Sequence, residues 1–268
     1  MTIVIGYNKP RPTEEDYTQF IEIIVDGLEP YVEKGVSLMA YGSFTRPQDF
    51  VPGRSDIDAL LLTRDNVVTD KKLLRNVSKV LAYALEKHYV PFQISVSDIA
   101  TMMDGRFNTY DLTFEEYFRE EGKIFAGPDY RNTFAFQLPI IPSQAEVLWG
   151  LRKARQQLLF AEYNLRNDYP AFLKGFEKTL QTTSRGSKQL LYMVDGKLRV
   201  EKCSALETVA EIFPKVNPEP LRDIKWLYTH PAELDRIYKI PKISLEIMNQ
   251  SLTFLEEMIR EYIALVPK

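Results

Sequence analysis

The first 140 residues alternate between the hydrophobic spacing of helices and that of strands. Strands are predicted at 36–43, 56–63, 90–98 and 123–126, and helices at 13–34, at 69–88 and from a capping box at Thr113 and Glu116 to near Gly122. Strands that alternate with helices in this way are typical of a mixed α/β domain. We therefore expect such a domain over residues 1–140.

The pattern changes to an almost purely helical one after residue 140. Ser143 and Glu146 form a second capping box, which opens a long helical run to about Asn167. Prolines divide the rest into several helices, of which the last is predicted from about Ser244 to Leu265. The sequence therefore predicts an α+β chain in which residues 141–268 form a helical C-terminal domain.

The candidate functional residues lie at the end of the first predicted strand and at the start of the second. Gly42 and Ser43 directly follow the first apolar strand, and a glycine there lets backbone N–H groups approach phosphate oxygens closely. Asp56 and Asp58 are two residues apart, so both carboxylates should point to one face of the next strand while Ile57 enters the core. Magnesium prefers carboxylates supplemented by water and substrate phosphates. The pattern therefore predicts a Mg²⁺ and phosphate site.

Short matches of this kind are often no more than a turn, a loop cap and a surface acid. Here, however, the glycine and serine end one apolar strand, and the acids begin the next. The apolar run 59–62 would bury the strand behind the acids. This agreement between motif and predicted elements favours the functional interpretation.

The order Gly42-Ser43, loop, Ser55-Asp56-Ile57-Asp58 and apolar strand resembles the polymerase-beta-type nucleotidyltransferase superfamily. Within it, the chain is most similar to aminoglycoside adenylyltransferases of the streptomycin/spectinomycin type. The segments 123–129 (KIFAGPD) and 187–214 also resemble that family, so the likeness covers most of the chain. It implies a polymerase-beta-like catalytic domain followed by a helical domain, with the substrate bound in the cleft between them.

The resemblance also implies roles for individual residues. Asp56 and Asp58 would hold Mg²⁺, and a second set would bind the nucleotide: Gly42, Ser43, Arg46, Ser55 and, from the helical domain, Lys202. The implied reaction moves a nucleoside monophosphate onto a hydroxyl of a small acceptor, such as an aminoglycoside. ATP is the expected donor, although the residues do not distinguish it from other nucleoside triphosphates.

One position departs from the family pattern. The family supplies a third carboxylate from the next strand, and the alignment places Gln93 there. Glutamine cannot accept a proton, and Asp98 and Asp104 are the nearest acids that could replace it. Two alternatives therefore stay open: a nucleotide-binding regulatory or interaction protein without turnover, and a transferase that acts on a protein or RNA acceptor.

Composition and charge narrow these possibilities. One cysteine and two histidines exclude a His/Cys zinc cage and an intramolecular disulfide. A formal net charge of −3 disfavours a nucleic-acid partner held by diffuse positive charge. No secretory signal or membrane-length apolar run is found, so we expect a cytoplasmic protein without a membrane partner.

Two charged clusters are further candidates for substrate binding. A basic cluster is expected to face the triphosphate: Arg185, Lys188, Lys197, Arg199 and Lys202. An acidic cluster near the aromatic residues Tyr110 and Tyr117 would suit a cationic acceptor: Asp104, Asp111, Glu115, Glu116 and Glu120. The alternative for the basic cluster is a solvated helix face, and the alternative for the aromatic residues, Phe118 included, is a place in the core.

Overall fold

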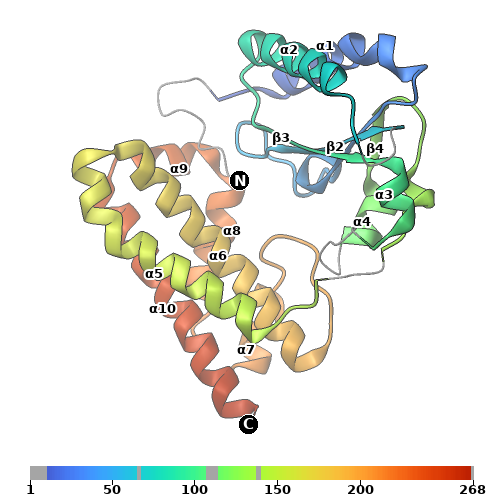
Figure 1. The fold of residues 1–268 in the computed structure, drawn as a ribbon. Coiled ribbons are helices and arrows are strands. Elements are labelled where there is room, and N and C mark those ends of the chain that lie inside the picture. Colours follow the sequence, from blue (N-terminus) through green and yellow to red (C-terminus); the bar gives the residue numbers. More distant parts are fainter. Residues whose placement is uncertain (1–10, 65–67, 107–113, 137–139, 267–268) are drawn as a thin grey trace. The chain divides into compact units, whose positions relative to one another are not determined.

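The computed structural model describes residues 11–64, 68–106, 114–136 and 140–266 (Figure 1). Its described residues form a mixed α/β structure with ten α-helices and one four-stranded mixed sheet. Contacts divide the chain into two compact units. We call the part up to Ile140 the α/β unit and the part from Ile141 the helical unit. The division falls where the sequence pattern changes.

The sheet of the α/β unit has the strand order β3-β2-β1-β4. Its strands are β1 (Ser37–Tyr41), β2 (Ile57–Thr63), β3 (Phe92–Asp98) and β4 (Lys123–Ala126). Strand β1 is antiparallel to both β2 and β4, whereas β2 and β3 are parallel. Each strand lies within, or coincides with, a segment that the hydrophobic pattern predicts.

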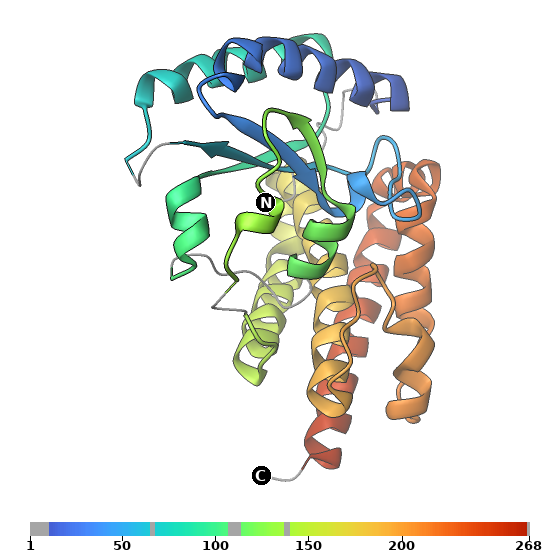
Figure 2. The same ribbon diagram turned by 90° about the vertical axis from the view of Figure 1, so that its right-hand side faces the viewer.

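Helices cover both faces of this sheet (Figures 1 and 2). Helices α1 (Glu14–Val32) and α2 (Lys71–Lys87) lie on one face, and the short α3 (Ile99–Asp104) and α4 (Phe114–Glu121) on the other. Alternate residues of β2 serve the two layers: Ile57 and Leu61 pack with α1 and α2, and Leu60 with Phe118 of α4. The sheet is therefore buried on both sides along most of β2.

The helical unit is a bundle of three long and three short helices within the described residues. They are α5 (Gln144–Asn167), α6 (Tyr169–Asp195), α7 (Leu206–Ile212), α8 (Glu219–Thr229), α9 (Pro231–Tyr238) and α10 (Pro241–Leu265). Ser143 caps α5 as predicted. Helix α10 begins three residues before the predicted Ser244, because proline fits the first turn of a helix, where no N–H is needed.

Helix α6 supplies much of the core of the helical unit. Phe172, Phe176, Leu180 and Leu191 are each at most 1% exposed and belong to one cluster with residues of α5, α8 and α10. Among the helices that the structure describes, none combines the length and apolar character that a membrane span requires.

Candidate functional site

The two acids of the motif lie at the start of β2, on one side of it. Ile57 is fully buried, whereas Asp56 and Asp58 are each partly exposed, which is the alternation that a strand imposes. In the sheet Asp58 pairs with Tyr41 of β1 and with Gln93 of β3. Residues Phe92 and Ile94 pack toward α1 and α2, so Gln93 shares the opposite face with Asp58. The position beside Asp58 is therefore held by a neutral amide.

A tight turn follows β1 and approaches the same carboxylate. Gly42 has a φ of +82° and begins a short 3₁₀ turn, Gly42–Thr45, which the Thr45 hydroxyl closes by donating to the Gly42 carbonyl at 3.0 Å. A Cβ atom at position 42 would lie 2.9 Å from Oδ2 of Asp58. Only glycine therefore allows this backbone to turn so close to the acid, and it places Ser43, which is 5% exposed, directly after the turn.

The loop between the turn and the acids is held by internal bonds. Arg46 is 7% exposed, and its guanidinium lies 3.0 Å from a carboxylate oxygen of Asp49 and 3.6 Å from one of Glu121. Ser55 is 1% exposed, and its hydroxyl accepts a hydrogen bond from the Val51 N–H at 3.0 Å. Both residues were predicted to bind the nucleotide, and the contacts described here give each of them a role in fixing the loop.

An aromatic cluster supports the same loop from α1. The Tyr17 ring packs against Phe44 and Phe50, with ring centroids 5.9 and 5.1 Å away. Its hydroxyl donates a hydrogen bond of 2.5 Å to the Ser55 carbonyl, and burial raises the pKa of this phenol above its usual range. The sequence analysis missed Tyr17, Asp49 and Glu121 because nothing in their local pattern distinguishes them from core or surface residues.

The two acids considered as substitutes for the third carboxylate have other partners. Asp98 is 5% exposed and caps α3, accepting hydrogen bonds from the N–H and hydroxyl of Thr101 at 2.8 and 2.5 Å. It lies five residues along β3 from Gln93, which is roughly 16 Å in a strand. Asp104 pairs with Arg106 at 2.6 Å. Over the described ranges no cluster of three or more His, Cys, Asp or Glu side chains could hold a metal.

The donor set at the start of β2 nevertheless fits Mg²⁺. Asp56 and Asp58 offer two carboxylates on one side of the strand, and Gln93 is the sheet partner of Asp58. Magnesium is bound by one or two carboxylates when water and substrate phosphates complete its octahedron. The Cα hydrogen of Gly42 leaves room next to Asp58 that any larger residue would fill. This arrangement suits a metal that arrives with a phosphate substrate.

The residues of the basic cluster predicted in the helical unit have different surroundings: some stabilise a loop, and others are exposed. Lys188 donates to the Val200 carbonyl at 3.1 Å, and Arg199 pairs with Asp195 at 2.6 Å, so both hold the loop that follows α6. Lys202 is exposed, and its ammonium lies 5.5 Å from the ring centroid of Tyr228. Next to it, burial raises the pKa of the Cys203 thiol, which is typical of an inert cysteine.

The acidic cluster predicted in the α/β unit is only partly described. Glu115 pairs with Arg119 at 3.1 Å, and Glu120 is exposed. Tyr110, Asp111 and Thr113 lie outside the described residues, as do the side chains of Glu116 and Tyr117. Since Asp104 and Glu115 each have an arginine partner, their charge is partly neutralised before any ligand binds.

Comparisons with known proteins do not assign this chain to a family. No protein-family model matches it, and no curated protein sequence matches it either. The interpretation of the site therefore rests on the residues and their geometry.

Proposed function

We propose that the chain is a magnesium-dependent nucleotidyltransferase, in which a polymerase-beta-like catalytic domain precedes a helical C-terminal domain. It would transfer a nucleoside monophosphate, AMP from ATP, to an oxygen of a small acceptor and release pyrophosphate. One observation carries the proposal: Asp56 and Asp58 lie on one side of β2, beside the tight turn at Gly42 and Ser43. The resemblance of these motifs to the adenylyltransferases supports it.

The residues divide the work of such a reaction between them. Asp56 and Asp58 would bind the metal, and the metal would supply positive charge that offsets the negative charge of the phosphates. The backbone N–H groups at Gly42 and Ser43 would hold phosphate oxygens, because the turn has no side chain that blocks their approach. The braced loop between Arg46 and Ser55 keeps the turn and the acids in register. Lys202 would contribute a positive charge to the triphosphate.

Because residue 93 is a glutamine, the proposed site lacks a third carboxylate that could act as a general base. The Gln93 amide can orient a ligand by hydrogen bonding, but it cannot remove a proton from an acceptor hydroxyl. General-base help is typically worth about 10²–10⁴ in rate, so a hydroxyl acceptor would react slowly here. This deficit bears on the choice of acceptor.

Pyrophosphate release from Mg²⁺-ATP over a panel of acceptors tests the proposal. We expect release that depends on one class of acceptor and falls by about 100-fold or more when Asp58 is changed to alanine. Asp26→Asn is the matched control, because Asp26 is an exposed acid of α1 with no part in the motif. Equal loss in both variants would contradict a metal role for Asp58.

A second candidate function follows from Gln93: a protein that binds nucleotide without turnover. It predicts Mg²⁺-ATP binding that Asp58→Ala weakens, together with no pyrophosphate release for any acceptor. Calorimetric titration should detect Mg²⁺-ATP binding in both cases, so the pyrophosphate assay separates the two: release with some acceptor favours the transferase, and binding without release favours this candidate.

A further inference from the structure

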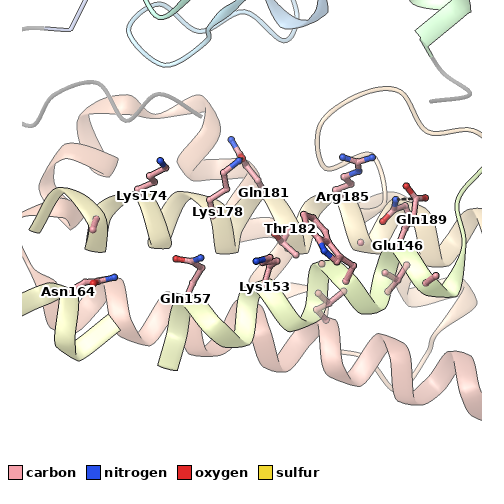
Figure 3. A pocket seen from close by; sticks show the side chains of 17 residues that line it. Glu146, Lys153, Gln157, Asn164, Lys174, Lys178, Gln181, Thr182, Arg185 and Gln189 are labelled. Carbon is pink, nitrogen blue, oxygen red and sulfur yellow. Dashed lines mark hydrogen bonds between the residues drawn. The ribbon is translucent and has the colours of Figure 1, made fainter. Parts of the chain in front are cut away.

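A groove runs between α5 and α6 in the helical unit (Figure 3). The two helices form an antiparallel hairpin, in which Gly150 faces Thr182 and Gln157 faces Gly175. The groove has a volume of about 880 Å³. All of its lining residues belong to the helical unit, so its chemistry follows from that unit alone.

The charge of this groove is opposite to that of the whole chain. Lys153 comes from α5, and Lys174, Lys178 and Arg185 come from α6. Glu146 is the one carboxylate among the lining residues, so four positive charges less one negative charge give +3, against −3 for the chain. Figure 3 shows Lys174, Lys178 and Arg185 in a row along α6, with Lys153 on the facing helix.

These four cations are not neutralised by ion pairs within the described part of the chain, although Lys153 donates to the Gln156 amide at 3.4 Å and Lys178 to the Gln181 amide at 3.5 Å. Among the described residues, no carboxylate lies within 4.0 Å of any of the four. Glu146 instead accepts a hydrogen bond from the Gln189 amide at 3.3 Å. Helix α6 has two acids of its own: Glu177 is buried and accepts from the Tyr238 hydroxyl, and Asp195 pairs with Arg199. The groove therefore keeps an uncompensated positive charge, which attracts anions.

The volume of the groove and the spacing of its cations suit a small ligand with more than one anionic group. Sites for small molecules commonly have volumes of about 300–1,000 Å³, a range that includes this groove. Along a helix, Lys174 and Lys178 are roughly 6 Å apart and Arg185 is roughly 10 Å further on. The amide of Gln157, which also lines the groove, can bind a hydroxyl group of such a ligand.

We infer that this groove binds a small phosphate ester, and that esters of this class are the acceptors of the transferase. The second half of the inference rests on the proposed function. It is supported by Gln93, because a phosphate monoester has its second pKa at about 6 and is already deprotonated near neutral pH. Such a nucleophile needs no general base, whereas an alcohol does.

Transfer of AMP to a phosphate ester needs no reagent other than ATP and the ester. A phosphate oxygen of the acceptor forms a bond to the α-phosphorus of ATP, and the bond from that phosphorus to the α–β bridging oxygen breaks. The bond's electron pair leaves with pyrophosphate, and the product carries a new phosphoanhydride. A cationic aminoglycoside is disfavoured as the ligand of this groove, since it would meet like charge.

Binding is tested first, without nucleotide, by calorimetric titration with fructose 1,6-bisphosphate, hexauridylate RNA and streptomycin. We expect the bisphosphate to bind and its Kd to rise by about 100-fold in Lys174→Glu/Lys178→Glu, since two charge-assisted contacts are lost. Lys225→Glu/Lys242→Glu is the matched control, with the same change of charge at exposed lysines outside the groove. Tighter binding of the RNA, loss of binding in both double variants, or binding of streptomycin alone would overturn the small-anion assignment.

Transfer is tested next with fructose and fructose 1,6-bisphosphate as acceptors for Mg²⁺-ATP. The expected result is pyrophosphate release with the bisphosphate and little with fructose. Equal release with the two would overturn the acceptor assignment and leave the groove as an anion site. A third outcome is no release with either acceptor, while the bisphosphate still binds both to the original protein and to the Asp58→Ala variant. That result would overturn the proposed function and leave the anion-binding site standing.

Discussion

The molecule has two polar surfaces of opposite charge that are built in different ways. One surface, the acidic strand end, consists of Asp56 and Asp58 on β2 and lies beside the turn at Gly42 that follows β1. The basic groove takes Lys153 from one helix and Lys174 and Arg185 from another. The first depends on exact backbone register, and the second on flexible side chains in a row. We therefore expect the proposed metal site to tolerate no shift of its backbone, and the proposed anion site to accept ligands of several shapes.

The acidic strand end should therefore be sensitive to damage in its supporting loop. Arg46→Met removes the partner of Asp49 and Glu121, of which Asp49 has a side chain only 10% exposed. Leaving a buried carboxylate unpaired should lower the free energy of unfolding of the α/β unit by about 3 kcal/mol. Urea denaturation followed by circular dichroism measures this loss.

Arg222→Met is the control for that prediction, because Arg222 pairs with Glu219 on the exposed surface of α8. An exposed pair contributes about 0.5 kcal/mol or less, so this variant should unfold almost like the original protein. A similarly small effect of Arg46→Met would contradict the bracing role and favour direct phosphate binding by Arg46.

The second prediction concerns the residue next to Asp58. Gln93→Glu restores a carboxylate on the sheet partner of Asp58 and should raise transfer to a hydroxyl acceptor by about 100-fold. Transfer to a phosphate ester should not rise, because that nucleophile is already deprotonated and the new charge repels it. Initial rates of pyrophosphate release with fructose and with fructose 1,6-bisphosphate measure the contrast.

Gln250→Glu, an exposed position of α10, should change neither rate. An equal gain for both acceptors in Gln93→Glu would mean that the new carboxylate strengthens metal binding rather than acting as a base. That result would remove the support that Gln93 gives to an anionic acceptor.

The sequence was sufficient to predict features that depend on residues close together in the chain. The period of two across Asp56, Ile57 and Asp58 predicted their alternate burial, and the apolar run after them predicted β2. Thr13 and Ser143 marked the starts of α1 and α5 because a helix cap lies within three residues of its partner. Short-range rules of this kind need no knowledge of the tertiary structure.

The sequence was insufficient where partners are far apart in the chain. Arg46 was predicted to bind phosphate, and its contact with Glu121 depends on where α4 packs. The basic groove needs the antiparallel register of α5 and α6, which decides that Lys153 and the lysines of α6 line one cavity. In the sequence alone, Lys174 and Lys178 look like an ordinary solvated helix face. The basic cluster predicted from the sequence shares only Arg185 with the groove.

The third prediction concerns Gly42 and distinguishes two effects of replacing it: strain in the backbone and a clash with the Asp58 carboxylate. Gly42 and Gly196 both have positive φ, +82° and +67°, but a Cβ at Gly42 meets Asp58 whereas one at Gly196 meets nothing within 4 Å. Alanine at either position should cost about 1 kcal/mol of unfolding free energy. Only Gly42→Ala should also lower pyrophosphate release, by about tenfold, because it displaces the carboxylate. Equal activity in the two variants would exclude a close approach at Asp58.

The smallest expected effect concerns the helices behind the acidic strand end. Asp16 of α1 lies 3.0 Å from Nδ1 of His88 at the end of α2, and this hydrogen bond, with those from Thr13, lowers the pKa of Asp16 from 3.8 to about 2. A carboxyl whose pKa is lower in the native state stabilises it above about pH 4 and loses this contribution as the pH falls toward 2. Its side chain is 34% exposed, so solvent screening reduces the contribution to about 1 kcal/mol.

Asp16→Asn tests this contribution through urea unfolding at about pH 5.5 and about pH 2.5. The variant should be less stable than the original protein by about 1 kcal/mol at the higher pH, and the difference should shrink at the lower pH, because there the carboxyl of the unfolded chain is already protonated and that of the native state is approaching its pKa. Asp26→Asn on the same helix should show no such dependence. A difference that persists unchanged at low pH would assign the loss to the capping geometry rather than to the charge.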